Sequence, residues 1–207
     1  MQSKSLIRWG GMALLVGGVL YTINSFFYTN NYSPKAPFNP LWLSLQIIIT
    51  IFYALSTLGL IGLHLRQKDK AGKLGLIGII LAIFGSAITF VTSLGFAFVI
   101  PAVAAQQANP LSPIDLSSPT GPLAWIGVLM WAWLLAFIPG YILTGIVTIR
   151  TRILPRWAGI FVSVGMILIF VAAFAVSVSQ SFWLRNIGGM LSGVGLAWLG
   201  YALWSNR

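Results

Sequence analysis

The sequence predicts an all-α, polytopic membrane protein: a single six-helix transmembrane domain over residues 1–207. Two observations predict it. Six long apolar runs contain no Asp, Glu, Lys or Arg, and each approaches or exceeds the roughly 20 residues that cross about 30 Å of hydrocarbon. The basic residues gather in alternate connections between these runs. Backbone amides find no water in lipid, and the short alternating segments of a β-barrel are missing, so the runs are expected to be helices.

The first span is expected to be a permanent helix. In chain order, the six spans are Trp9–Tyr28, Leu41–Leu63, Leu74–Val99, Leu123–Ile149, Trp157–Val178 and Ile187–Trp204. The first has the positive start of a signal peptide, but its apolar body is too long for a cleaved signal and no small-x-small site follows. One narrow stripe of this helix holds Gly10, Gly17, Tyr21, Asn24 and Tyr28.

The second span carries the most polar stripe of the chain. Its members lie within about 40° of one another on an ideal helix: Gln46, Thr50, Tyr53, Thr57 and His64. One interpretation is the lining of a cavity or pathway for a neutral polar or amphipathic ligand. The other is hydrogen bonding to Asn24 and to the serine and threonine face of the third span. Because lipid would leave a polar side chain unsatisfied, we expect the stripe to face protein.

The third, fifth and sixth spans each present small residues along one face. These faces are Gly75, Gly78, Ala82, Ser86, Thr89 and Ser93; Gly159, Ser163, Ala173 and Ser177; and Gly189, Gly193 and Gly200. Small side chains let helix backbones approach closely in lipid, where van der Waals contact drives association. We therefore expect these faces to contact protein and the larger apolar residues opposite them to contact acyl chains.

The fourth span is aromatic and interrupted. It contains Pro139 and Gly140, and a proline in a helix interior removes a backbone hydrogen bond and clashes with the preceding turn. We expect a kink near Phe137 and a pocket beside it. Trp131 and Trp133 point about 200° apart, so at most one of them faces the interior. Trp131 is the candidate wall for a lipid tail, pigment or other apolar ligand.

Two connections and one repetition complete the pattern. Pro101–Pro122 carries five prolines and Asp115, and Thr29–Pro40 is also rich in Asn, Tyr and Pro. Both are expected to be external loops and are the places where partner contacts are expected. The longer loop could form a cap over the outer mouth or be a solvated linker. The starts of the first, third and fifth spans are alike: Arg8-Trp9-Gly10-Gly11, Lys73-Leu74-Gly75 and Arg156-Trp157-Ala158-Gly159. Three helical hairpins would explain this echo, and so would the general chemistry of helix starts at a membrane surface.

Charge sets the predicted orientation. Ten basic residues fall on one side of the membrane, namely Lys4, Arg8, Arg66, Lys68, Lys70, Lys73, Arg150, Arg152, Arg156 and Arg207. Only Lys35 and Arg185 fall on the other. Short loops rich in Lys and Arg stay cytoplasmic, so both termini are expected in the cytoplasm. These residues flank helices instead of covering a soluble face, so the net charge of +10 indicates contact with anionic headgroups and no nucleic-acid partner.

The residue inventory excludes several chemistries. Cysteine is absent and His64 is the single histidine, which removes thiolate catalysis, Fe–S clusters and bis-histidine haem. No span carries a carboxylate or a lysine, which proton pumps, retinal proteins and intramembrane hydrolases need at membrane depth. We therefore expect no catalysis and no metal site, and the residues identify no cofactor.

Two stretches of the sequence carry a family resemblance. They are Leu6-Ile7-Arg8-Trp9-Gly10-Gly11 with Gly17-Gly18-Val19-Leu20, and Leu154-Pro155-Arg156-Trp157-Ala158-Gly159. Through them the chain resembles uncharacterised multi-spanning bacterial inner-membrane proteins, over about a fifth of its length. The resemblance rests on membrane anchors and glycines. It implies the inner membrane of a prokaryotic cell and carries over no activity, cofactor or catalytic residue.

Two functions remain open. The first is a non-catalytic integral membrane protein that binds an apolar ligand, such as a lipid or pigment, or a partner membrane protein. The alternative is a small permease for a neutral or apolar solute, without intramembrane carboxylate coupling. The expected ligand-binding residues are Asn24, Gln46, Thr50, Tyr53, Thr57, Trp131 and Pro139. They would surround an apolar pocket near the proline bend.

Overall fold

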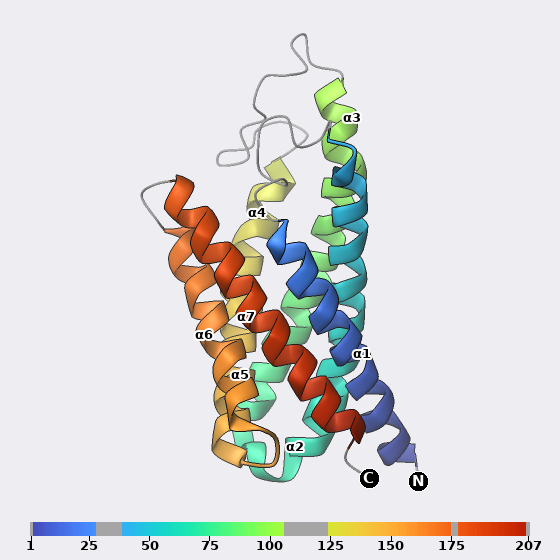
Figure 1. Cartoon of the computed structure of the whole chain (residues 1–207), viewed down its shortest axis with the longest axis vertical. Coiled ribbons are helices and arrows are strands. Elements are labelled where there is room, and N and C mark those ends of the chain that lie inside the picture. Colours follow the sequence, from blue (N-terminus) through green and yellow to red (C-terminus); the bar gives the residue numbers. More distant parts are fainter. Residues whose placement is uncertain (1, 28–38, 106–123, 175–177, 206–207) are drawn as a thin grey trace.

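The computed structural model describes residues 2–27, 39–105, 124–174 and 178–205, and all regular elements within these ranges are helices. In chain order they are α1 (Gln2–Phe26), α2 (Leu41–Leu94), η3 (Gly95–Val99), α3 (Ile100–Ala105), α4 (Ala124–Ala132), η5 (Trp133–Phe137), α5 (Ile138–Thr151), α6 (Arg156–Ala173) and α7 (Val178–Ser205). The elements η3 and η5 are π-helical turns. The predicted all-α class is confirmed (Figure 1).

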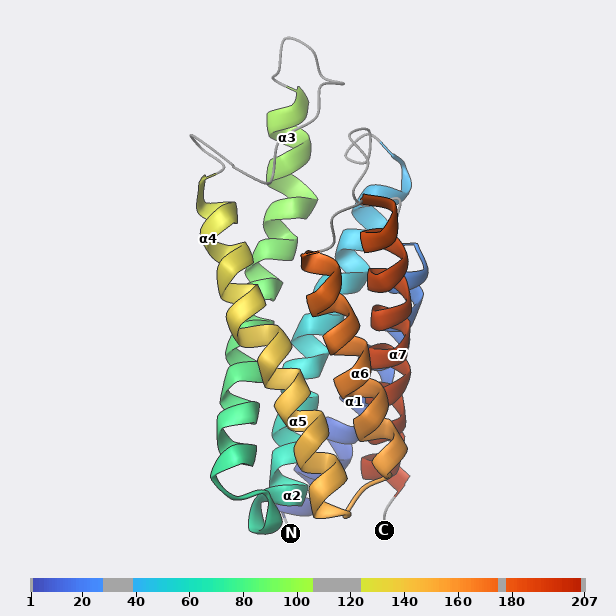
Figure 2. The same cartoon turned by 90° about the vertical axis from the view of Figure 1, so that its left-hand side faces the viewer.

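Among the described residues, five helical stretches are long and apolar enough to cross a membrane: Lys4–Phe26, Leu41–Val103, Val128–Thr151, Arg156–Ala173 and Trp183–Ser205. The second stretch is a hairpin, because α2 reverses at Gly72 (φ 58°, ψ −162°), a conformation that glycine alone adopts readily. Trp42 Nε1 donates to Phe96 O at 3.1 Å, whereas a straight helix would separate these residues by about 80 Å. The first half of α2 (41–71) therefore runs antiparallel to the second half (73–94) (Figures 1 and 2).

The first half of α2 extends further than the sequence predicts. The polar connection expected at 64–73 is helical as far as the reversal at Gly72. Gln67 holds this extension against α5, because its buried side chain donates from Nε2 to Thr148 Oγ1 at 3.1 Å. Arg, Gln and Lys are good helix formers, so the loss of apolar residues did not end the helix.

The long helices pack in chain order around a closed bundle. α1 contacts the first half of α2 and α7, α5 contacts the second half of α2 and α6, and α6 contacts α7. Small residues make these contacts as predicted: Gly10 faces Gly62 of α2, and Gly18 faces Gly193 of α7. The described members of the small-residue faces are buried, with the exception of Ala173, which is exposed at the end of α6. Tyr28 and Ser177 lie outside the described residues.

The similar starts of the first, third and fifth predicted spans pack in similar ways. Counted from Arg8, Lys73 and Arg156, the residues two, six and nine positions further on are buried in all three helices. They are Gly10, Leu14 and Gly17 in α1, Gly75, Ile79 and Ala82 in α2, and Ala158, Val162 and Gly165 in α6. Each of these faces contacts the helix that follows in the chain. The bundle thus contains three hairpins with matching inner faces.

Each π-helical turn ends two residues before a proline: η5 before Pro139 and η3 before Pro101. Proline has no N–H for the carbonyl four residues earlier, and a π turn moves the bonding partner by one residue. The distortion expected near Phe137 is therefore present as a π turn. Residues 101–105, expected to begin an external loop, lie inside α3 instead. Residues 29–38 and 106–122 of the two predicted loops lie outside the described residues.

The outer surface of the bundle is apolar. Large Leu, Ile, Val, Phe and Trp side chains are exposed along α1, α2, α6 and α7 and on α4 and η5, whereas soluble monomers rarely expose large contiguous apolar patches. Trp183 and Trp204 are exposed near the two ends of α7, about 32 Å apart along the helix at 1.5 Å per residue. This spacing matches the hydrocarbon thickness of a bilayer. A helical bundle with such a surface is typical of multi-pass membrane proteins.

Charged residues gather at one end of the bundle, here called the basic end. It holds the start of α1, the end of α7, the reversal of α2 and the connection between α5 and α6 (Figure 1). Its described charged residues are Lys4, Arg8, Arg66, Lys68, Asp69, Lys70, Lys73, Arg150, Arg152 and Arg156. In the part of the chain that the structure describes, Arg185 near the opposite end of α7 is the exception.

Candidate functional site: the polar stripe, the aromatic core and a basic groove

The polar stripe of α2 faces the interior, as the sequence predicts. Three of its five members are buried, namely Gln46, Thr50 and Tyr53, and the other two, Thr57 and His64, are half-buried. The Thr50 hydroxyl lies 2.7 Å from the Ser93 hydroxyl in the second half of α2. Asn24 of α1 donates from Nδ2 to Leu45 O at 2.9 Å. These bonds join three helical segments, which is the packing interpretation of the stripe. A ligand-binding role for the same residues stays a prediction.

Aromatic rings fill the interior where the sequence predicts a pocket. Tyr21 stacks on Phe52 with ring centroids 4.4 Å apart, and Phe52 contacts Tyr53 at 5.0 Å. Tyr53 meets Phe137 edge to face at 5.7 Å, and Phe137 contacts Tyr141 at 4.6 Å. Phe137 and Tyr141 have no exposed surface. The centre of the bundle beside the proline bend is thus packed with rings, because the π turn directs Phe137 inward.

Trp131 lies apart from the other predicted site residues. Its side chain is 62% exposed, so it faces outward, where acyl chains would surround it. Trp133 is the tryptophan of this helix that faces the core, stacked on Phe137 with centroids 6.2 Å apart. Pro139 is half-buried just beyond the π turn. Trp131 therefore does not line the interior of the bundle, and a ligand-binding role for it stays a prediction.

A second polar cluster, which the sequence analysis missed, joins α2 to α5 near the basic end. Gln67 donates to the Thr148 hydroxyl, which in turn donates to Thr144 O at 2.9 Å. A cavity of about 10 Å³ beside them is lined in part by His64. That volume holds one water molecule at most. This cluster is a packing contact with too little space for a larger ligand.

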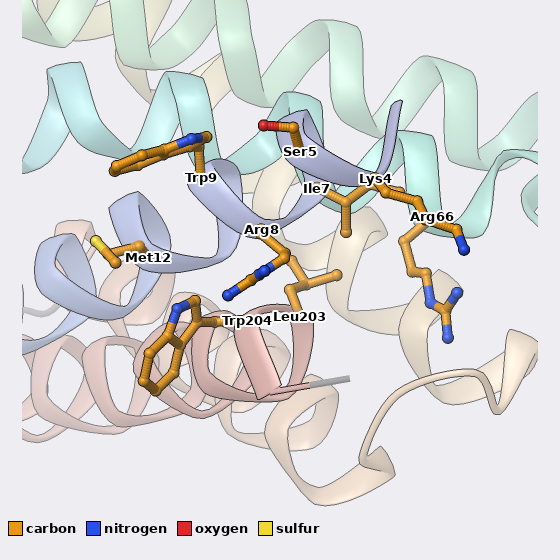
Figure 3. A pocket seen from close by; sticks show the side chains of 9 residues that line it. All are labelled: Lys4, Ser5, Ile7, Arg8, Trp9, Met12, Arg66, Leu203 and Trp204. Atoms are coloured by element: carbon orange, nitrogen blue, oxygen red, sulfur yellow. The ribbon is translucent and has the colours of Figure 1, made fainter. Parts of the chain in front are cut away.

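An open groove of about 820 Å³ lies at the basic end. Its nine lining side chains come from three helices (Figure 3): Lys4, Ser5, Ile7, Arg8, Trp9 and Met12 of α1, Arg66 of α2, and Leu203 and Trp204 of α7. α1 and α7 lie against one another here, and the extended first half of α2 brings Arg66 alongside. The groove lies where the start of α1, the end of α7 and the last turns of the first half of α2 meet.

The lining of the groove changes in character along α1. Lys4 and Arg66 extend to the same side at one end of the groove, and Met12 lies at the other end (Figure 3). Arg8 extends between Trp9 and Trp204 in this view. The nine lining residues include three cations and no acid. The groove therefore offers positive charge beside aromatic and apolar surface.

The described residues provide few groups for covalent chemistry. No cluster of three or more His, Asp or Glu side chains that could hold a metal occurs among them. The groove lining has two arginines and a lysine but no carboxylate or imidazole to exchange protons near neutral pH. The lining combines positive charge with apolar surface, which is the chemistry that suits an amphipathic anion.

Comparison with protein-family models, with curated proteins and with solved structures finds no match to this chain. Function must therefore be inferred from the groove and the core themselves.

Proposed function

We propose that this chain is a six-crossing protein of a bacterial inner membrane, with its basic end in the cytoplasm. The hairpin in α2 supplies two crossings, which turns five long apolar stretches into six. Most of the described Lys and Arg residues lie at the basic end, and short loops rich in these residues stay cytoplasmic. The prokaryotic setting is the one that the resemblance of the helix starts implies.

Cysteine labelling tests this topology, and the chain has no native cysteine to interfere. Single cysteines would be placed at the exposed positions Lys70, Ala105 and Ser205. An impermeant thiol reagent added to intact cells should label Ala105→Cys, while Lys70→Cys and Ser205→Cys should react only after lysis. Labelling of Lys70→Cys in intact cells would reject the proposed orientation.

The function of the protein is to bind a membrane lipid at the basic end, without covalent chemistry. One observation carries this proposal: the groove of about 820 Å³ opens at the end of the apolar surface and combines cations, tryptophans and apolar side chains. Tryptophans occupy the level of the headgroups in membrane proteins, and basic residues attract the headgroups themselves. The groove thus matches a lipid in both its polar and its apolar parts.

The permease alternative has less support. A path along the polar stripe would run through the aromatic core, where Phe52, Tyr53, Phe137 and Tyr141 are buried and in contact. Opening such a path would require α2 and α5 to separate, with loss of the packing that holds them together. The groove at the basic end is already open to the bilayer surface.

Native mass spectrometry tests lipid binding. The protein would be extracted in a mild detergent, and bound phospholipid would be counted before and after detergent exchange. Trp9→Ala should reduce retained lipid, because Trp9 lines the groove and is 68% exposed. Trp157→Ala is a matched control: Trp157 also follows an arginine, is 63% exposed and lies outside the groove lining. Equal losses in the two variants, or no retained lipid at all, would overturn the proposal.

A further inference from the structure

We propose that the groove selects an anionic glycerophospholipid, whose phosphate lies among Lys4, Arg8 and Arg66 and whose acyl chain runs past Met12. This inference rests on the proposed lipid-binding function and names the class of lipid. It is carried by the charges that line the groove, by the order of polar and apolar groups along it, and by its position at the end of the bundle.

The charges favour an anion over a zwitterion. Three cations and no acid line the groove. Asp69, the one acid among the described residues, follows Arg66 on α2 but is not part of the lining. The headgroup of phosphatidylcholine would bring an ammonium into this positive field, whereas the headgroup of phosphatidylglycerol, in which only the phosphate is charged, brings none. Basic residues near an anionic membrane surface each strengthen attraction about fivefold.

The donors suit a phosphate. Lys4 of α1 and Arg66 of α2 extend to the same side at one end of the groove, while Arg8 extends toward Trp204 (Figure 3). Lys4 and Arg66 can therefore contact a phosphodiester from two helices, with Arg8 on the side of the tryptophans. The guanidinium fork binds phosphate oxygens in pairs, and the lysine ammonium adds a point charge. Ser5, also in the lining, provides a neutral hydroxyl for a glycerol oxygen.

The order of groups follows that of a phospholipid. Lys4 and Met12 lie about 12 Å apart along α1, which is enough to reach from a phosphate to the first carbons of an acyl chain. Trp9 and Trp204 lie between these levels (Figure 3), and indoles prefer the interface where the ester groups lie. Beyond Met12, the exposed side chains of α1 are Val16, Val19, Ile23 and Phe26, which continue an apolar surface for the acyl chain.

The test is a lipid titration of the delipidated full-length protein, followed by native mass spectrometry. The ligands are phosphatidylglycerol and phosphatidylcholine with identical acyl chains. The groove variant combines Lys4→Gln, Arg8→Gln and Arg66→Gln. The control variant combines Lys73→Gln, Arg150→Gln and Arg156→Gln, which removes three charges from the same end of the bundle outside the groove lining.

We expect the unmodified protein to prefer phosphatidylglycerol. The groove variant should bind it about 100-fold more weakly and lose the preference, and the control variant should change by less than about fivefold. If the groove variant does not assemble, Arg8→Gln alone should weaken phosphatidylglycerol binding about fivefold and leave phosphatidylcholine binding unchanged.

Four outcomes would overturn the inference, and together they separate its failure from the failure of the proposed function. Equal binding of the two lipids in the groove would leave the lipid-binding function standing and remove the anionic selectivity. Equal losses of lipid affinity in the groove and control variants would mean that the lipid is held by general attraction to the basic end and not by the groove. Displacement of the lipid by millimolar sn-glycerol 3-phosphate or inorganic phosphate would mean that the three cations of the groove bind a soluble anion instead of a lipid. Absence of any lipid binding would remove both proposals.

Discussion

Gly18 offers a sharp test of the close packing between α1 and α7. A Cβ atom at this position would lie 2.6 Å from Gly193 O and 2.8 Å from Ala197 Cα. Both neighbours are backbone atoms, so no side chain can turn away to make room. Gly18→Ala therefore requires the two helices to move apart by several tenths of an ångström or more. The same two helices hold the groove residues Arg8 and Trp204 next to one another.

The expected loss follows from the contacts. Overpacking of a well-packed interface by one methyl group destabilises by about 1–3 kcal/mol, and a gap of 0.5–1 Å elsewhere along the interface forfeits about a quarter to a half of each van der Waals contact. Gly17 is the matched control one residue away on α1. Its Cβ would lie 3.4 Å from Leu55 Cβ and 3.5 Å from Phe52 Cδ2, which are ordinary contact distances. Gly17→Ala introduces no such clash and should not lower stability.

The assay is SDS-induced unfolding of the two variants in mixed micelles, followed by the fluorescence of the nine tryptophans. Gly18→Ala should shift the unfolding midpoint clearly to lower SDS, and Gly17→Ala should leave it in place. Similar midpoints for the two variants, or a larger loss at Gly17, would refute the interface geometry between α1 and α7.

Three further predictions concern local features. Gly72→Ala should destabilise by about 1–3 kcal/mol in a thermal melt, because φ 58° and ψ −162° strain a side chain even though its Cβ meets no atom within 4 Å; an unchanged melting temperature would contradict this. A double-mutant cycle of Thr50→Ala and Ser93→Ala should give a coupling of about 0.6 kcal/mol in SDS unfolding, and zero coupling would remove the bond. Trp133→Ala should lower stability by about 2 kcal/mol and Trp131→Ala by less than about 0.5 kcal/mol. A larger loss for Trp131→Ala than for Trp133→Ala would mean that Trp131, and not Trp133, faces the core.

The helical period was enough to predict which faces of the bundle are buried. Ser86, Thr89 and Ser93 share one face of an ideal helix, and the structure buries all three. The reason is physical: small side chains let helix backbones approach closely in lipid, and hydroxyl groups on such a face can bond to a neighbouring helix, as Ser93 does with Thr50. Apolar residues on the opposite faces needed no such partner and are exposed.

The helical period alone could not predict whether Trp131 or Trp133 faces the core. It places them on opposite sides of the helix, but which side meets the core depends on how this helix lies against α2. The π turn at Trp133–Phe137 also adds a residue to one helical turn and so rotates the faces beyond it. Pro101 and Pro139, each two residues after a π turn, were the sequence signals for these distortions.

The groove could not be predicted, because its residues come together only through the fold. Arg8 and Arg66 were interpreted as topology anchors, and nothing in their spacing shows that α2 continues past the apolar run to bring Arg66 beside α1. Trp204 joins them because α7 ends at the level where α1 begins. Pairs such as Arg8-Trp9 and Arg156-Trp157 look alike in sequence, but only the first lines a groove.

Photo-crosslinking in a membrane tests the lipid-binding proposal most directly. The protein would be reconstituted in liposomes that contain a phosphatidylglycerol with a photoreactive diazirine near the top of one acyl chain, and adducts would be located by peptide mass spectrometry. Occupation of the groove predicts adducts concentrated at Met12 and Trp204, well above those at Trp157 and Trp183, which are exposed to lipid outside the groove. Adducts spread evenly over the four positions would contradict a lipid site at the basic end.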